Sequence, residues 1–221
     1  MSVRKLPHPP EDRRPQPTPD DPTLAGAVQT GERAENVALP PGLAPRLRRA
    51  FRAPRAGRAA LMPYLTGGHP TLQTSERLVA TLIDAGADVV ALGIPFSDPV
   101  AEDLVVRRST RGALDAGVTP DDVLALATAH SPAVPFVLLT HLNPVIAYGP
   151  ERFFVRAATA GVEALASRDI PLDEAVGRDA GLARDAGGLA LLAAEAGVSL
   201  VPVATPTSTD VRLDLVAAAA T

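Results

Sequence analysis

Five short apolar segments, separated by stretches with helical periodicity, constrain the fold of this 221-residue chain more than any other feature. We expect strands at 59–65, 89–92, 134–139, 162–166 and 198–204. Such an alternation is typical of β–α units, whose strands form a parallel sheet with helices packed against it. A doubly wound sheet and a (β/α)₈ barrel both have this pattern.

The segments between the strands carry recognisable helix signals. Thr119 is expected to cap a helix whose first residue is Pro120, and Gly149-Pro150 is expected to open another. Gly86 is expected to end the helix that precedes it. The other predicted helices cover 43–52, 104–116, 181–196 and 210–220.

The N-terminal segment differs in composition from the rest of the chain. Residues 1–42 are rich in proline and charge and contain few large apolar side chains, so we predict a disordered arm there. The remaining segment, 43–221, is predicted to form one domain. Because a complete (β/α)₈ barrel typically takes about 250 residues, five strands favour an open sheet or an incomplete barrel.

Composition excludes several classes of function. The net charge is −4 and no basic stripe is interleaved with aromatic residues, which argues against a nucleic-acid surface. The chain has no cysteine, so disulfides, thiol catalysis and cysteine-based metal sites are excluded. No apolar run approaches the roughly 18 residues that a membrane span needs. We therefore expect a cytoplasmic protein that binds no nucleic acid, membrane or metal.

Polar residues gather where the predicted strands end, which is where parallel α/β folds bind ligands. His69 and His141 both follow strands and could share one site, where either could act as a general acid or base. The adjacent carboxylates Glu102 and Asp103 are more often solvated surface charge. Ser97-Asp98-Pro99 is interpreted as a turn and helix cap.

Six motifs occur in an order that resembles one known family. The most specific is Leu92-Gly93-Ile94-Pro95-Phe96-Ser97-Asp98-Pro99, which follows Asp84-Ala85-Gly86-Ala87-Asp88. The others are Tyr64-Leu65-Thr66-Gly67-Gly68-His69-Pro70, Gly112-Ala113-Leu114 with Gly117-Val118-Thr119, Leu139-Thr140-His141-Leu142-Asn143-Pro144, Asp169-Ile170-Pro171-Leu172-Asp173-Glu174-Ala175 and Thr205-Pro206-Thr207-Ser208. From about residue 45 onward the chain is similar to the tryptophan synthase α-subunit family.

The resemblance implies a TIM-barrel fold and a lyase reaction in tryptophan biosynthesis. Members of this family cleave indole-3-glycerol phosphate to indole and glyceraldehyde 3-phosphate, without a cofactor of their own. Two carboxylates at the barrel mouth move the protons. The indole passes to a β subunit that carries pyridoxal phosphate, so such a subunit is the expected partner.

The resemblance also implies roles for individual residues. The two family carboxylates fall on Ala91, where the glutamate is lost, and on Glu102, where the family has aspartate. Tyr64, Thr66 and His141 are expected to contact substrate. Asp169, with Arg168 beside it, is expected at the interface with the β subunit.

Several positions depart from the family pattern. His69 replaces an aspartate, His141 a tyrosine and Arg168 a proline, and Asp103-Leu104 replace Gly-Pro. The motifs of the family's later strands, which hold the phosphate, are not found, so we expect an incomplete barrel with about five of eight strands.

Three functional interpretations follow from these departures. The chain is an α-type lyase, a catalytically inactive relative that acts as a binding or regulatory partner of a β-type subunit, or a repurposed enzyme. The third would use Glu102, His69 and His141 on another small substrate. For turnover by this chain, the loss of the glutamate at Ala91 favours the second interpretation over the first.

Overall fold

The computed structural model of the protein describes residues 44–52, 58–170 and 188–219. The predicted arm at 1–42 lies outside the described residues. So do residues 171–175 of the fifth family motif and the first part, 181–187, of one predicted helix.

Five strands form one sheet in which every neighbouring pair is parallel. They are β1 (Tyr64–Thr66), β2 (Val90–Gly93), β3 (Phe136–Thr140), β4 (Val162–Ser167) and β5 (Ser199–Val201). Their order in the sheet is their order in the sequence, β1-β2-β3-β4-β5. A doubly wound sheet reverses direction part-way, whereas a barrel adds each strand to the same edge. The order therefore confirms the TIM-barrel type of α/β fold, with five strands described.

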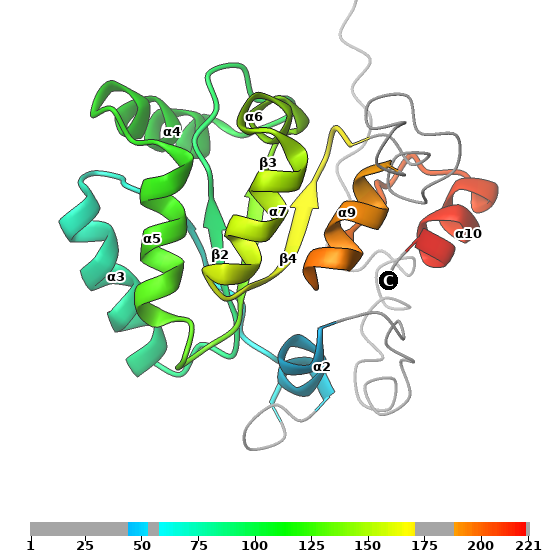
Figure 1. The fold of residues 1–221 in the computed structure, drawn as a ribbon, viewed down its shortest axis with the longest axis horizontal. Coiled ribbons are helices and arrows are strands. Elements are labelled where there is room, and N and C mark those ends of the chain that lie inside the picture. Colours follow the sequence, from blue (N-terminus) through cyan, green and yellow to red (C-terminus); the bar gives the residue numbers. More distant parts are fainter. Residues whose placement is uncertain (1–43, 53–57, 171–187, 220–221) are drawn as a thin grey trace, which may run out of the picture. The chain divides into compact units, whose positions relative to one another are not determined.

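Eight helices are described, and most of them follow a strand. They are α2 (Pro45–Arg52), α3 (Leu72–Asp84), α4 (Leu104–Asp115), α5 (Pro120–His130), α6 (Leu142–Tyr148), α7 (Pro150–Thr159), α9 (Gly188–Ala196) and α10 (Asp210–Ala219). Figure 1 shows α3, α5, α7 and α9 in succession along one face of the sheet, each in contact with the next.

The sheet has a different core on each face. On the helix-covered face, Leu92, Leu138 and Leu165 are almost fully buried and belong to the same cluster as Phe153 and Phe154 of α7. Because side chains alternate along a strand, residues an odd number of positions away from these leucines point to the opposite face. There Val89, Val137 and Ala164 form a second, smaller cluster with Ala44 and Leu47.

Helix α2 packs at the amino ends of the strands, and two polar side chains receive its first amides. The Leu47 amide donates to Glu163 Oε2 at 3.1 Å, and the Ala44 amide donates to Ser199 Oγ at 3.1 Å. Arg46 adds an ion pair to the other Glu163 oxygen at 3.3 Å. The amides of a helix's first turn have no partner within the helix. Residues on β4 and β5, far along the chain, therefore cap α2.

The predicted first strand is wrong in its extent. Only Tyr64–Thr66 forms a strand, and Leu61 and Met62 are exposed rather than buried. Pro63 has no amide hydrogen and cannot donate to a ladder. It does accept from the Ala91 amide at 2.9 Å, so this segment runs beside β2 without becoming a regular strand.

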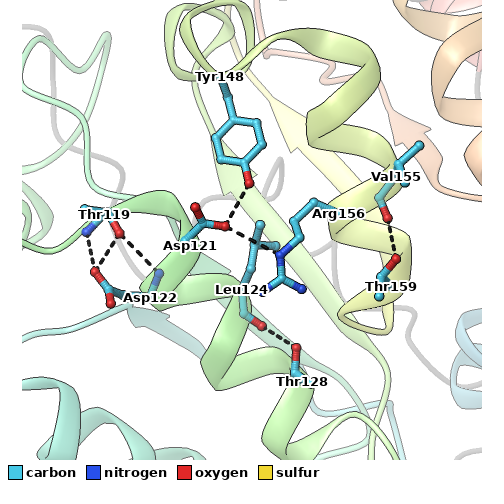
Figure 2. Close-up of polar contacts among 9 residues, drawn as sticks. All are labelled: Thr119, Asp121, Asp122, Leu124, Thr128, Tyr148, Val155, Arg156 and Thr159. Atoms are coloured by element: carbon cyan, nitrogen blue, oxygen red, sulfur yellow. Dashed lines mark hydrogen bonds and ion pairs between the residues drawn. The ribbon is translucent and has the colours of Figure 1, made fainter.

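The start of α5 agrees with its sequence signals. Thr119 and Asp122 form a reciprocal capping box with Pro120 in the first turn. The Thr119 side chain and amide lower the pKa of Asp122 below its usual value. Figure 2 shows that the neighbouring Asp121 binds two other helices, accepting from Tyr148 Oη at 2.8 Å and lying 3.5 Å from Arg156 Nε.

Helix α6 was missed by the sequence prediction. Its residues were interpreted only as a motif that follows a strand, and the proline within its first turn concealed it. A proline in the first turn costs no helix hydrogen bond, because those amides lack partners within the helix in any case.

Truncating Leu47 tests how much α2 contributes to stability. Leu47 is 1% exposed, so Leu47→Ala is expected to lower the free energy of unfolding by about 2–4 kcal/mol in chemical denaturation. Leu191→Ala on α9 is the matched control, because Leu191 is 45% exposed and its loss should cost far less. Equal effects of the two substitutions would show that α2 is not docked.

Glu163 makes the docking of α2 depend on pH. Burial raises the pKa of Glu163 above its ordinary value of 4.5, although the Leu47 amide and Arg46 partly oppose this. The folded state therefore binds this proton more tightly than the unfolded chain does. The resulting stabilisation is complete below pH 4.5 and is lost as the pH rises through the raised pKa.

Glu163→Gln, which keeps an acceptor but never ionises, is expected to gain stability relative to the wild type as the pH rises through this window. Denaturation at a series of pH values measures the difference. Glu195→Gln, at an exposed position on α9, is the matched control for replacing a carboxylate with an amide. A difference for Glu163→Gln that is constant with pH would contradict the assigned burial effect.

Candidate active site at the carboxyl ends of the strands

A pocket of about 290 Å³ lies at the carboxyl ends of the strands. Its apolar wall includes Val106, Leu139, Ala166 and Val203. Its polar wall contains Tyr64, Glu102, Asp103, Thr140, His141, Ser167 and Arg168. Small-molecule sites usually span about 300–1,000 Å³ and combine an apolar lining with a few polar groups. The volume therefore suits a small ligand with an apolar body.

Tyr64 stands on β1 and leans over β2. A side chain at Gly93 would collide with the Tyr64 hydroxyl, so glycine makes room for this ring. The hydroxyl lies 3.2 Å from Thr66 Oγ1, which lies 2.7 Å from Ser109 Oγ. Ser109 donates its one hydrogen to the Val106 carbonyl at 2.9 Å. Thr66 must then donate to Ser109 and Tyr64 to Thr66, so the phenol oxygen can act only as an acceptor toward a ligand.

Burial raises the pKa of Tyr64, even though the residue keeps 40% of its surface exposed. The hydrogen bond with the Thr66 hydroxyl opposes this rise in the pKa. The negative charge of Glu102 raises the pKa further, Arg168 lowers it, and Asp103 adds a smaller increase. These three charged groups thus act on the same phenol from around the pocket.

The two adjacent carboxylates have different roles. Asp103 accepts from the Val105 and Val106 amides at 2.8 and 2.9 Å, and so caps α4. The helix cap is therefore Asp103, and the prediction that Ser97-Asp98-Pro99 provides one is wrong: the Asp98 carboxylate accepts from the Ser97 side chain instead. Glu102 Oε2 is buried and has no hydrogen-bond partner within the described residues.

His141 lies at the end of β3 and is 5% exposed. Its Nε2 accepts the Val100 amide at 3.1 Å, so Nε2 carries no proton and the neutral ring is protonated at Nδ1. Its ring also packs against Phe96, with 5.3 Å between the centroids.

Arg168 and Asp169 follow β4 and do not pair with each other. Arg168 Nη1 donates to the Ala101 carbonyl at 2.6 Å. Asp169 Oδ1 accepts from the Ser167 hydroxyl at 2.6 Å and from the Leu142 amide, the first of α6, at 2.9 Å. Arg168 is exposed and Asp169 is half-buried. Their expected contact with a β subunit stays a prediction.

The structure brings together four of the predicted site residues and leaves three outside. Tyr64, Glu102, His141 and Arg168 line the pocket. Thr66 supports Tyr64 from behind, Ala91 lies deeper in the sheet at 2% exposure, and Asp169 is not in the lining. Thr140 and Ser167, the last residues of their strands, also line the pocket, as the clustering of polar residues at strand ends predicts. Thr140 Oγ1 is buried and has no partner in the described part of the chain.

His69 does not join His141, contrary to the prediction. Its ring lies against Gly112 of α4, and His69 is not among the pocket-lining residues. Within the described ranges, no three His, Asp or Glu side chains are close enough to hold a metal ion. None of the described helices is both long and apolar enough to cross a membrane.

Comparison with known proteins shows the family of this chain. The family model described as tryptophan synthase alpha chain matches residues 51–221. The chain belongs to the tryptophan synthase alpha chain family. The alpha chain of Rhizorhabdus wittichii is 42% identical over 175 residues, which are 77% of this chain and 60% of that relative. The alpha chain of Dehalococcoides mccartyi is 37% identical over 163 residues, 73% of this chain and 60% of the relative.

Solved structures show the same fold. The open form of tryptophan synthase from M. tuberculosis with BRD0059 bound superposes with a TM-score of 0.71 at 32% identity, covering 80% of this chain and 68% of that one. The alpha chain from Legionella pneumophila gives 0.68 at 29% identity, covering 79% and 63%. This chain spans about 60% of the length of the two curated relatives named above.

Titration of Tyr64 tests the electrostatics of the pocket. The chain has two tyrosines and no tryptophan, so in a Tyr148→Phe background all tyrosinate absorbance comes from Tyr64. Glu102→Gln in that background should lower the pKa of Tyr64, because a nearby negative charge is removed. It should still exceed the usual value, because burial is the leading cause. Ultraviolet absorbance against pH measures the shift, with circular dichroism as a check on folding.

The matched control is Glu76→Gln in the same background, since Glu76 is exposed on α3 and does not line this pocket. Equal Tyr64 titration curves for Glu102→Gln and Glu76→Gln would show that Glu102 does not face the phenol.

Proposed function

We propose that this chain binds the indole-bearing ligand of the tryptophan synthase α reaction, indole-3-glycerol phosphate or its indole product, in the pocket at the strand ends. We further propose that it is at most a slow lyase and acts as the α-type partner of a β-type subunit. This assignment places it in the cytoplasm, in tryptophan biosynthesis.

The observation that carries the proposal is the buried Glu102 Oε2, which has no hydrogen-bond partner within the described residues. Buried polar atoms nearly always have a hydrogen-bond partner, and a buried charged oxygen without one is costly. An indole N–H would supply the missing donor, while its flat ring would cover the apolar wall formed by Leu139, Ala166 and Val203. Glu102 is also the residue that falls on a carboxylate of the family pattern.

The reaction makes three demands on protons. C3 of the indole must gain a proton, the indole nitrogen must give one up, and the glycerol hydroxyl must be deprotonated before the carbon–carbon bond breaks. Glu102 can serve the indole nitrogen. The second family carboxylate falls on Ala91, which has no ionisable group and is buried on β2 between Tyr64 and Val137.

The missing acid–base group accounts for the proposed low rate. A well-placed general acid or base typically contributes about 10²–10⁴-fold to the rate. Tyr64, the nearest neighbour of Ala91 on β1, does not replace it, because burial holds its pKa above the usual value and its proton is directed to Thr66.

The partner proposal rests on family membership and on the exposed end of β4. Arg168 is exposed there and donates to the Ala101 carbonyl, and Asp169 is half-buried and accepts through Oδ1 from the Ser167 hydroxyl and the Leu142 amide. A β-type chain that binds this end of the sheet would also cover the pocket.

Indole binding and indole release test the two parts of the proposal separately. Calorimetry with the full chain should show indole binding, and Glu102→Leu should weaken it roughly 10–100-fold, the range expected for a lost hydrogen bond to a charged group. Release of indole from indole-3-glycerol phosphate, with and without a pyridoxal-phosphate β chain, should stay far below the rate of an alpha chain that has both carboxylates.

Glu151→Leu on the exposed face of α7 is the matched control and should leave the indole affinity unchanged. Indole release at an ordinary family rate would overturn the proposal of a slow lyase. An indole affinity that Glu102→Leu leaves unchanged would overturn the assignment of the pocket.

A further inference from the structure

Two consecutive residues of the loop that follows β2 form hydrogen bonds with side chains that follow β3 and β4. The loop runs from Ile94 to Asp103 and carries Glu102 near its end. The Val100 amide donates to His141 beyond β3, and the Ala101 carbonyl accepts from Arg168 beyond β4. The two contacts lie immediately before Glu102 in the sequence.

The contact with His141 depends on an unprotonated Nε2. The imidazole is buried and its ring is fixed by Phe96 of the same loop, at 5.3 Å between centroids. A phenylalanine ring could keep the packing but would offer the Val100 amide no acceptor. The hydrogen bond and the ring packing therefore both join β3 to this loop.

The contact with Arg168 holds a strained residue. Ala101 has a φ of 55°, in the left-handed region that residues with a side chain seldom adopt. Such a conformation persists only where its surroundings enforce it. The guanidinium, 2.6 Å from the Ala101 carbonyl, is a charge-assisted donor at this residue.

The end of the loop is fixed as well. Asp103, the residue after Glu102, accepts hydrogen bonds from two amides of α4. The two residues before Glu102 form hydrogen bonds with side chains that follow β3 and β4. Glu102 is thus confined on both sides, and its Oε2 is buried at the pocket, where no described residue forms a hydrogen bond with it.

Four of the departures from the family pattern concern this loop. Proline at position 168 could not donate a side-chain hydrogen bond, tyrosine at 141 has no ring acceptor where Nε2 lies, and glycine at 103 could not cap a helix with its side chain. Glu102 itself is one methylene longer than the aspartate of the pattern. Four substituted residues, Glu102, Asp103, His141 and Arg168, therefore belong to this loop or form hydrogen bonds with it.

We propose that His141 and Arg168 are positioning residues that clamp Val100 and Ala101 and so hold the Glu102 carboxylate in the pocket. The role deepens the proposed function and rests on it for its ligand, but the clamp itself can be measured without one. His141 acts as an acceptor and Arg168 as a donor on the backbone.

Amide hydrogen exchange followed by NMR on the full chain tests the clamp directly. His141→Phe should speed exchange of the Val100 amide, which loses its acceptor, by roughly five- to tenfold or more. Arg168→Met should speed it to a similar extent, because it releases the neighbouring Ala101 carbonyl. The Leu138 amide in the core of β3 should exchange at its wild-type rate. In the wild type, the His141 nitrogen spectrum should show an unprotonated Nε2.

Two pairs of variants separate positioning from general damage. His141→Gln and Arg168→Lys keep an acceptor and a donor at these positions, and should restore most of the loop protection. His130→Phe and Arg111→Met make the same substitutions away from the loop, and should leave its exchange unchanged. Loop exchange at wild-type rates in His141→Phe and Arg168→Met would overturn the clamp. So would equal loss of protection in the control variants.

Indole titration of the same variants connects the clamp to the ligand. If the clamp positions Glu102, His141→Phe and Arg168→Met should weaken indole binding in proportion to their loss of loop protection, and the two rescue variants should recover it. Unchanged affinity in variants with a mobile loop would overturn the positioning role. If the wild type binds no indole, the proposed function fails, while the exchange data still decide whether the clamp exists.

Discussion

The parallel ladder of five strands, in the order in which they occur in the chain, determines every functional feature of this protein. Because each strand points the same way, the polar residues at the carboxyl ends of β1, β3 and β4 and in the loop after β2 meet around one pocket. Helix α2 packs at the amino ends of the strands, where Glu163 and Ser199 accept hydrogen bonds from the first amides of the helix. The amino ends of the strands therefore contribute to stability, and the carboxyl ends carry the candidate site.

At the carboxyl ends of the strands, the conformation of the loop backbone determines where the polar side chains of the site lie. The loop after β2 carries Glu102, and its geometry is set by contacts from β3, β4 and α4. The phenol of Tyr64 has its proton directed away from the pocket, toward Thr66. With Ala91 buried beneath, Glu102 is the lining carboxylate that stays free to meet a ligand, since Asp103 is engaged with α4. The arrangement suits recognition of an N–H donor better than a sequence of proton transfers.

The alternation of strands and helices predicted the parallel α/β fold, and the strand-end rule together with the family resemblance indicated Tyr64, Glu102, His141 and Arg168. Errors arose where backbone chemistry overrode the apolar pattern. Pro63 shortened β1 because it has no amide to donate, and a proline in the first turn hid α6. His69 failed for a different reason: a position after a strand does not specify the direction of a side chain, and this one turns toward Gly112. The contacts of Val100 and Ala101 join residues 41 and 67 positions apart, which no local pattern reveals.

The central claim is that the clamped loop presents Glu102 to an indole ring at the strand ends. A crystal structure of the full chain with indole bound tests this most directly. The account predicts the ring against Leu139 and Ala166, with its N–H within hydrogen-bond distance of the Glu102 carboxylate and the Val100 and Ala101 contacts in place. Indole bound elsewhere, or a Glu102 carboxylate turned away from the pocket, would contradict it.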